Sequence, residues 1–275
     1  MYPGTRPERG YVLGRKPKKQ KIMGKTALIT GATSGIGHAT ALRLARNGYD
    51  VILTGRRQDR LEHLKGVIRQ ETQAEVIPLC FDIRDKRAVA EALESLEPRF
   101  RAVDVLVNNA GLAAGLEHID EGSLEDWERM IDTNVKGLLY VTRIVSGWMI
   151  SRSSGHIINM GSVAGVQTYE NGNVYCATKH AVHALSEGMR IDLLRHGIKV
   201  SEIRPGMVET EFSTVRFHGD KERADQVYKG VTPLYGDDIA SVVEWLVSLP
   251  PHMNVTEVQV MPTQQADAFY TYRKQ

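Results

Sequence analysis

The chain has 275 residues, of which 42% are hydrophobic and 25% charged, enough for one large α/β domain or two small ones. Its apolar runs are too short to cross a bilayer, and residues 1–25 lack the apolar stretch of a secretory signal. Two cysteines, Cys80 and Cys176, make a disulfide framework implausible. We therefore expect reduced thiols in a cytoplasmic protein without a membrane partner.

The net charge of +2 conceals an uneven distribution. Residues 1–25 hold eight lysines and arginines and one acid, so the remainder of the chain is acidic overall. The prolines and glycines of this stretch argue against a packed element, and we expect a basic, disordered leader over residues 1–22. A short cationic tail can bind polyanions, but we favour the leader and expect no nucleic-acid partner.

The first elements after the leader are a strand, a glycine-rich loop and a helix. An apolar run predicts a buried strand over 26–32, and apolar spacing predicts a helix over 36–47. Between them, TGATSGIG (30–37) places Gly31, Gly35 and Gly37 where a chain must turn sharply and approach a phosphate closely. Because a helix N-terminus offers free N–H groups, this loop predicts a dinucleotide site.

The second strand, predicted over 51–55, discriminates between the two nicotinamide cofactors. An NAD site usually carries Asp or Glu there for the ribose 2′-hydroxyl, but this chain has Arg56 and Arg57. A guanidinium binds a 2′-phosphate through paired hydrogen bonds. We predict NADP, with Arg56 as the principal ligand and Arg57 or Ser34 assisting. The alternative for each arginine is an ordinary exposed turn residue.

Strands and helices continue to alternate without hairpin turns. Helices are predicted over 60–72, 86–97, 124–150, 174–196 and 237–249, and strands over 76–83, 103–111, 156–162, 199–206 and 257–261. The pattern predicts a single Rossmann-type, doubly wound α/β domain over 23–275, with a seven-stranded parallel sheet and helices on both faces. Its ligand should lie at the carboxyl ends of the strands.

Three residues of the second half suggest proton transfer. Ser162 follows a predicted strand, and Tyr175 and Lys179 are four residues apart on one face of the next helix. A free phenol has a pKa of about 10, and a nearby ammonium lowers the pKa of such a group toward neutrality. Ser162 can orient a substrate oxygen to which Tyr175 gives a proton, or from which it takes one.

These segments together resemble the short-chain dehydrogenase/reductase family. TGATSGIG, NNAG (108–111), Asn134, Ser162, YCATK (175–179) and PG (205–206) match its pattern over about residues 25–262. The resemblance implies that Asn134, Ser162, Tyr175 and Lys179 are catalytic. It implies that Asn134 distorts the long helix and holds a water that relays protons to Lys179, and that Lys179 binds the nicotinamide ribose. It also implies a homotetramer.

The resemblance extends the cofactor site beyond the glycine loop and the arginine pair. For Asn108, a purely structural role is as acceptable as the contact on the adenosine side of the cofactor that the resemblance implies. No histidine has metal-ligand spacing with Cys or acidic residues, so we expect no metal. The predicted cofactor-binding residues are Gly31, Thr33, Ser34, Gly35, Ile36, Gly37, Arg56, Arg57, Asp82, Ile83, Asn109, Ala110, Gly111, Tyr175, Lys179, Pro205, Gly206, Val208 and Thr210.

The irregular segment over about 207–230 is the natural substrate lid. Its VETEFSTVRFHGD run (208–220) resembles the NADP-dependent 3-hydroxy acid dehydrogenases of the family, some of which oxidise L-serine and L-allo-threonine. Besides Ser162, the candidate substrate contacts are Arg216, which can pair with a carboxylate, and Gln167. The alternatives are a broad carbonyl reductase, a 3-oxoacyl-type reductase and, less favoured, a non-enzymatic NADP-binding sensor.

Overall fold

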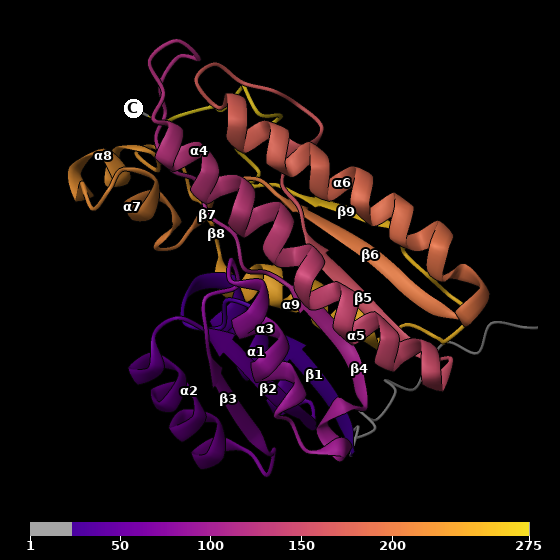
Figure 1. The fold of residues 1–275 in the computed structure, drawn as a ribbon. Coiled ribbons are helices and arrows are strands. Elements are labelled where there is room, and N and C mark those ends of the chain that lie inside the picture. Colours follow the sequence, from indigo (N-terminus) through magenta and orange to yellow (C-terminus); the bar gives the residue numbers. More distant parts are fainter. Residues whose placement is uncertain (1–23, 275) are drawn as a thin grey trace, which may run out of the picture.

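A sheet of seven strands runs through the centre of the molecule. The computed structural model describes residues 24–274, so the predicted leader over 1–22 lies outside the described residues. The strands follow the order β3-β2-β1-β4-β5-β6-β9, and every neighbouring pair is parallel (Figure 1). The predicted seven-stranded parallel sheet is confirmed. Its strands are β1 (Lys25–Ile29), β2 (Tyr49–Gly55), β3 (Val76–Cys80), β4 (Val103–Asn108), β5 (Gly155–Met160), β6 (Ile198–Pro205) and β9 (Glu257–Val260).

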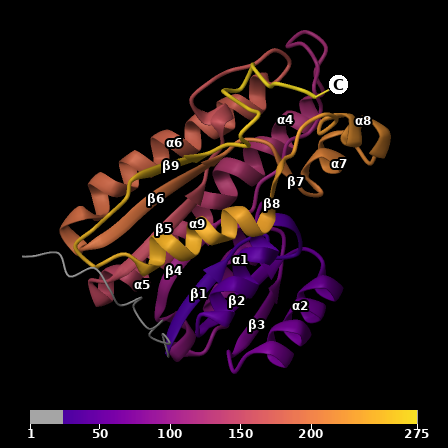
Figure 2. The ribbon, with the colours of Figure 1, turned by 180° about the vertical axis from the view of Figure 1, so that it is seen from behind.

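Helices cover both faces of this sheet, as predicted. One apolar core joins the sheet to α1, α2 and α9, and α9 crosses in front of the sheet in Figure 2. A second core joins the opposite face to α3, α5 and the end of α6, which lie in front in Figure 1. The long helices are α1 (Gly35–Arg46), α2 (Gln58–Glu71), α3 (Lys86–Glu94), α4 (Leu124–Ile131), α5 (Leu138–Arg152), α6 (Asn173–Leu193) and α9 (Gly236–Ser248).

The strand sequences supply both cores because successive side chains point to opposite faces. In β1, Ala27 and Ile29 enter the first core and Leu28 enters the second, all fully buried. Burial of one such large aliphatic side chain contributes about 1.5–3 kcal/mol. A continuous apolar run is therefore the sequence that a strand covered on both faces requires.

The predicted long helix over 124–150 is interrupted. A π-helical segment (Asp132–Gly137) separates α4 from α5. The absence of a side chain at Gly137 suits the packing, since a Cβ there would lie 2.9 Å from Ile83 Cγ2. The distortion at Asn134 that the resemblance implied lies in this segment, and the helix path continues through it.

Two parts of the fold create a crevice at the carboxyl ends of the strands. The chain places β2 and β3 on one side of β1 and then crosses to β4 on its other side. At such a change of direction the loops after the neighbouring strands separate and leave room for a ligand. Above this point, residues 207–230 form β7 (Val208–Glu209) and the short helices α7 (Phe212–Arg216) and α8 (Lys221–Gln226), seen at the edge of the molecule in Figure 1.

The remaining elements are short. β7 pairs in parallel with β8 (Leu234–Tyr235), a contact that the sequence did not predict, and it fixes the base of the 207–230 segment. The 3₁₀ helices are Pro98–Arg101, Val163–Gly165 and Leu194–His196. Within residues 24–274, no helix combines the length and the apolar character needed to cross a membrane.

Candidate active site

A cavity of about 660 Å³ opens at the carboxyl ends of the central strands. Residues that follow β1, β2, β4, β5 and β6 line it, together with the 207–230 segment and part of the C-terminal segment. This position is the one expected for a ligand in an open α/β sheet. The cavity therefore collects most of the predicted site residues in one place.

The glycine loop forms one end of the cavity. Gly31 and Gly35 have φ of +68° and +54°, a region that residues with a Cβ rarely adopt. A Cβ on Gly31 would also lie 2.9 Å from Ala110 Cα. The loop leads into α1, whose first turn has no acidic residue and whose N-cap, Ser34, makes no side-chain capping bond. The free N–H groups and the helix dipole suit an anion such as a pyrophosphate.

Gly37 has a different place from the one predicted. It is buried, and the residues lining the cavity do not include it. A Cβ on Gly37 would overlap the Gly31 carbonyl oxygen and Asn109 Nδ2. Its predicted contact with the cofactor is therefore corrected to a packing role, in which it lets α1 lie close against the glycine loop.

The end of β2 presents the two predicted arginines to the cavity. Arg57 donates hydrogen bonds to Thr33 Oγ1 and Ser34 Oγ, at 2.9 and 3.0 Å, and to Glu211 Oε2 at 2.8 Å. The Arg56 side chain is 58% exposed and lies 3.9 Å from Asp82 Oδ2. Arg57 is thus the more firmly placed of the two, because it is bonded directly to the glycine loop.

The neighbouring side of the cavity contains Asp82, Ile83, Ala110 and Gly111, four of the residues that the sequence proposed for the cofactor. Asn109 also lines it, and its Nδ2 donates to the carbonyls of Thr30 and Gly31, which fixes the glycine loop against β4. Asn108 points elsewhere. Its Nδ2 bonds Thr142 Oγ1 and Asn159 Oδ1 in the protein interior, so the structural role left open by the sequence is the one found.

Ser162, Tyr175 and Lys179 converge at the other end of the cavity. Tyr175 is hydrogen-bonded to Ser162, and the Ser162 Oγ accepts from Ala164 N. The Lys179 ammonium donates to the Met160 carbonyl at 2.9 Å and lies 6.0 Å from the centre of the Tyr175 ring. The predicted spacing on α6 therefore does bring phenol, hydroxyl and ammonium together.

The ionisation of these groups differs from the prediction. Burial raises the pKa of Tyr175, a shift to which Tyr169 adds, whereas Arg216 and the Ser162 hydrogen bond act in the opposite direction. Burial lowers the pKa of Lys179 to about 8. The predicted lowering of the phenol pKa by Lys179 is thus not found among the protein groups. A phenol with a raised pKa is a proton donor at neutral pH, and a positive nicotinamide ring acts in the lowering direction.

Asn134 lies behind this group rather than in the cavity wall. It is 2% exposed, its Oδ1 accepts from Leu112 N at 2.8 Å, and its Nδ2 donates to Leu112 O and Thr178 Oγ1. A Cβ on Gly111 would lie 3.3 Å from Asn134 Oδ1 and 3.5 Å from Lys179 Nζ, so both side chains border Gly111. The amide of Asn134 thus joins the π-helical segment to α6 and to the segment after β4, and its Oδ1 can accept one further hydrogen bond.

Arg216 reaches the catalytic end of the cavity from α7. Its guanidinium carbon lies 5.0 Å from the Tyr175 ring centre and 5.2 Å from that of Phe212, and Nη2 donates to Tyr169 Oη at 2.8 Å. Its Nε is buried and has no hydrogen-bond partner among residues 24–274. The sequence predicted Arg216 but missed Tyr169 and Phe212, although both aromatic residues lie near predicted site residues in the chain.

Gln167, the other predicted substrate contact, is placed differently. Its Oε1 accepts from Ala268 N at 2.8 Å, and it is not among the residues that line the cavity. Gln167 instead holds the C-terminal segment in position. That segment supplies lining residues that the sequence did not predict, namely Gln265, Ala268, Phe269, Thr271 and Arg273.

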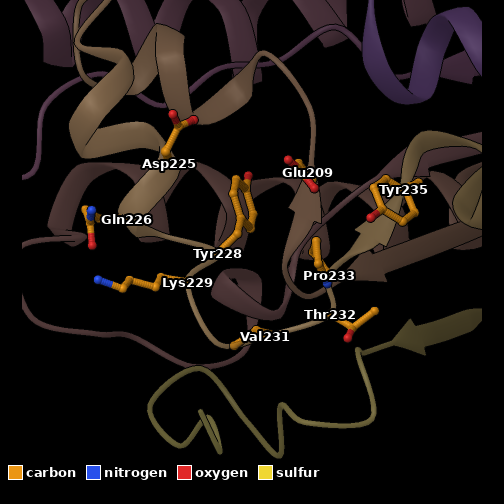
Figure 3. A pocket seen from close by; sticks show the side chains of 9 residues that line it. All are labelled: Glu209, Asp225, Gln226, Tyr228, Lys229, Val231, Thr232, Pro233 and Tyr235. Carbon is orange, nitrogen blue, oxygen red and sulfur yellow. The ribbon is translucent and has the colours of Figure 1, made fainter. Parts of the chain in front are cut away.

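A second hollow, of about 510 Å³, lies between α8 and the β7–β8 pair (Figure 3). Tyr228 lines both spaces and bonds Ser213 Oγ and Val208 O. The hollow carries the two carboxylates of Glu209 and Asp225 against one cation, Lys229, whereas cations outnumber carboxylates along the larger cavity, which suits an anionic dinucleotide better. The larger cavity is therefore the candidate nucleotide site.

Comparisons with known proteins agree with this geometry. The family model for short chain dehydrogenase matches residues 25–221. The "NADP-dependent 3-hydroxy acid dehydrogenase YdfG" of Salmonella typhi is 48% identical over 242 residues, covering 88% of this chain and 96% of that protein. The "Serine 3-dehydrogenase" of Rhizobium radiobacter is 46% identical over 253 residues, covering 92% and 100%.

The fold comparison gives the same result. A solved structure described as "The Closed form of serine dehydrogenase complexed with NADP+" has a TM-score of 0.85 and 43% sequence identity, and the match covers 91% of this chain and all of that one. The sheet order, the glycine loop and the Ser162–Tyr175–Lys179 group thus occur in a chain that belongs to the short-chain dehydrogenase family.

Proposed function

We propose that the protein is an NADP-dependent dehydrogenase that oxidises the β-hydroxyl of a small 3-hydroxy acid of the serine or allo-threonine type, or reduces the corresponding 3-oxo acid. The names of the relatives support the cofactor and the reaction class. The observation that carries the substrate class is Arg216, a cation facing Tyr175 inside the cavity with a buried Nε that lacks a partner in the described chain.

The residues of the cavity fit NADP. The positive φ of Gly31 and Gly35 and the uncapped start of α1 suit the pyrophosphate, while Arg57 and Arg56 suit the 2′-phosphate. Asp82 and Ile83 are assigned to the adenine side. At and beyond the end of β6, we assign Pro205, Gly206, Val208 and Thr210 to the nicotinamide end, and all four line the cavity.

When bound, the nicotinamide supplies the hydride acceptor or donor, and the residues of the chain handle the proton. In the oxidation, Ser162 orients the substrate oxygen and Tyr175 takes the hydroxyl proton, whereas in the reduction Tyr175 donates one. The oxidation requires Tyr175 as a phenolate, and we propose that the Lys179 ammonium, held by the Met160 carbonyl, favours that phenolate once the positive nicotinamide is bound. Asn134 positions the π-helical segment beside Lys179 and carries the proposed relay water.

Arg216 selects the substrate by its charge. Its planar guanidinium can form two parallel hydrogen bonds to a carboxylate, and its position over Tyr175 places the β-carbon of a short hydroxy acid near the phenol. We propose that residues 207–230 act as the lid, because they carry Arg216 and bind the glycine-loop side through the Arg57–Glu211 ion pair. Arg60 pairs with the same carboxylate.

A broad carbonyl reductase or 3-oxoacyl-type reductase on the same scaffold is the alternative. A pure NADP sensor is disfavoured, since the hydrogen-bonded Ser162–Tyr175 pair has no use in a sensor. We further propose a cytoplasmic homotetramer. The exposed Cys80 and the buried Cys176, both free, suit a reducing compartment, and α6 and the turn after it expose Ile191 and Leu194.

The test of the substrate class compares acids with neutral alcohols. NADPH formation at 340 nm is measured with L-serine, L-allo-threonine, 3-hydroxypropanoate and neutral secondary alcohols, for the wild type and Arg216→Met. We expect the KM for the acids to rise roughly 10- to 100-fold, the equivalent of a lost charged hydrogen bond of about 1.5–3 kcal/mol. The KM for neutral alcohols should change little by comparison.

The matched control is Arg223→Met. Arg223 is a second arginine of the same segment that stacks on Phe217 and is not among the cavity-lining residues. It should leave the KM for both substrate classes at the wild-type value. Preference of the wild type for neutral ketones and alcohols, with no specific loss for acids in Arg216→Met, would favour the broad reductase.

A further inference from the structure

Glu202 is a carboxylate enclosed beneath the active site. It lies on β6 and is 0% exposed, and its Oε1 has no hydrogen-bond partner among residues 24–274. A charged carboxylate in the interior is costly unless a cation or hydrogen-bond donors compensate it. Such a residue at this position requires a physical reason, and its surroundings supply one.

The Oε1 atom lies directly under the chain that forms the active site. A Cβ on Gly161 would overlap it, so the carboxylate packs against the backbone between Met160 and Ser162. The Met160 carbonyl receives the Lys179 ammonium, and Ser162 is bonded to Tyr175. Glu202 thus packs against the turn that carries Ser162 and the carbonyl group that binds Lys179.

The charge of Glu202 also acts on Lys179. Burial lowers the pKa of Lys179, and Glu202 is the group that acts in the opposite, raising direction. The lysine is 7% exposed and has the Met160 carbonyl as its hydrogen-bond acceptor. Because a neutral carbonyl cannot balance a buried ammonium, the carboxylate is the compensating charge on this side of the site.

The other groups around Glu202 hold it in place. His183, one turn after Lys179 on α6, has its Nδ1 2.7 Å from Glu202 Oε2. Arg204 on β6 has its Nε 3.9 Å from the same oxygen and is bonded to Glu257 on β9. Glu187 and Glu257 complete the outer edge, close to His183. Since Arg204 already binds Glu257, we read these residues as an ion-pair network rather than a metal site.

We propose that Glu202 is a positioning residue of the active site, whose buried carboxylate supplies the counter-charge to the Lys179 ammonium and whose packing fixes the Met160–Ser162 turn. The inference rests on the proposed proton transfer by Tyr175 and Lys179. It assigns to β6 a part in the reaction beyond the cofactor contacts at its carboxyl end.

The test is the pH profile of kcat for the oxidation in Glu202→Gln, which keeps the shape and an acceptor for His183 but removes the charge. With the carboxylate gone, Lys179 should lose its proton at lower pH, so the alkaline decline of kcat should move down by about one pH unit. That shift corresponds to roughly a tenfold lower kcat on the alkaline side. The substrate KM should change little.

Two further variants separate charge from packing. Glu257→Gln removes a carboxylate of the same network that touches neither Gly161 nor Lys179, and it should show the wild-type profile. Glu202→Asp keeps the negative charge on a side chain that is one methylene shorter. The alkaline decline of kcat should therefore stay at the wild-type pH, while the maximal kcat is lower. Glu202→Asp also provides the test if Glu202→Gln does not fold. An alkaline decline of kcat that moves to lower pH in Glu202→Asp would contradict the proposal.

The outcomes are distinguishable. An active, folded Glu202→Gln with the wild-type alkaline limb would overturn the assignment of Glu202 alone. An equal shift in Glu257→Gln would overturn it as well, since the effect would then belong to the net charge of the network. Absence of NADP-linked oxidation in the wild type would instead remove the proposed function on which the inference rests.

Discussion

Arg57 extends from the end of β2 across the glycine loop, where three hydroxyl and carboxylate groups receive its hydrogen bonds. One of these groups is Glu211, a carboxylate on the lid. Because an ordered guanidinium loses less side-chain entropy on binding, Arg57 is better prepared than Arg56 to receive a phosphate. The sequence predicted Arg56 as the principal ligand and Arg57 as an assisting one. We propose the reverse order, because the placement of Arg57 depends on residues 23 to 154 positions away.

Neutralising Arg57 should therefore change the cofactor preference. In Arg57→Gln we expect the KM for NADP+ to rise roughly 10- to 100-fold, because one or two charged hydrogen bonds are lost, and the KM for NAD+ to stay nearly constant. Arg56→Gln should have a smaller effect of the same sign. Steady-state kinetics with both cofactors measures this.

Arg60→Gln is the matched control, since Arg60 pairs with Glu211 but is not among the cavity-lining residues. It should leave the ratio of the two KM values unchanged. An unchanged NADP+ KM in both Arg57→Gln and Arg56→Gln would refute the assignment of the 2′-phosphate site.

The convergence of Ser162, Tyr175 and Lys179 on one cavity was predictable because its signal is local. Tyr175 and Lys179 share one helix, and Ser162 follows a strand whose end points to the same crevice. The ionisation of Tyr175 was not predictable, since it depends on burial by distant residues such as Phe212 of α7. Gln167 was misplaced for the same reason: its partner, Ala268, lies 101 positions along the chain.

At the scale of elements, the alternation of apolar runs and amphipathic segments determined the parallel sheet and its two helical faces. The order of the strands was not readable from that pattern, because neighbours such as β1 and β4 pair residues that are 77 or 78 positions apart. Likewise, the two-residue strands β7 and β8 are too short to carry a periodic signal. The π-helical segment had a local sign, an asparagine and a glycine inside an otherwise helical pattern.

The pairing of β5 and β6 contains a buried histidine with consequences for stability. His156 is 5% exposed, and its Nε2 lies 2.8 Å from Ser201 Oγ, which itself donates to Val255 O. Nε2 therefore carries the proton, and the buried Nδ1 has no partner in the described chain. Burial, with Lys199 adding to it, lowers the pKa of His156 to about 3.

Stability should consequently fall in acid. Between pH 6.5 and 3 the unfolded chain binds a proton at His156 that the folded chain does not, so the free energy of unfolding decreases as the pH falls through this window. From pH 7 to pH 5 the loss from this residue is about 2 kcal/mol. His156→Gln, which keeps the Ser201 contact, should flatten this dependence in urea unfolding curves.

His252→Gln is the comparison variant, because His252 is exposed in the loop after α9. Its unfolding free energy should follow the wild-type dependence on pH. Equal slopes for His156→Gln and the wild type between pH 7 and 5 would show that the buried imidazole does not carry the effect.

At the scale of the whole molecule, the cavity draws on segments from Gly31 to Arg273. Its shape therefore requires the complete fold. The outer surface adds a second expectation, because α6 and the turn after it expose Ile191 and Leu194 to 74% and 73%. Apolar side chains exposed together on one helix end suit a contact between subunits.

The proposed homotetramer is measured by size-exclusion chromatography with light scattering. We expect four copies for the wild type, and a smaller assembly for Ile191→Glu combined with Leu194→Glu, because burial of the two carboxylates is unfavourable. A matched pair of charges on the exposed α3 positions Lys86→Glu and Arg87→Glu should leave the mass unchanged. A monomeric wild type at micromolar concentration would contradict the tetramer.

The proposed reaction depends most on the phenol of Tyr175 as the group that transfers the proton. The most direct measurement is the kcat of Tyr175→Phe for NADP-linked oxidation of a 3-hydroxy acid, with NADP+ affinity measured by fluorescence titration. We predict a loss of about 10²- to 10⁴-fold in kcat, the range typical of a removed general base, with NADP+ affinity close to that of the wild type. Turnover of Tyr175→Phe at the wild-type rate would contradict the account.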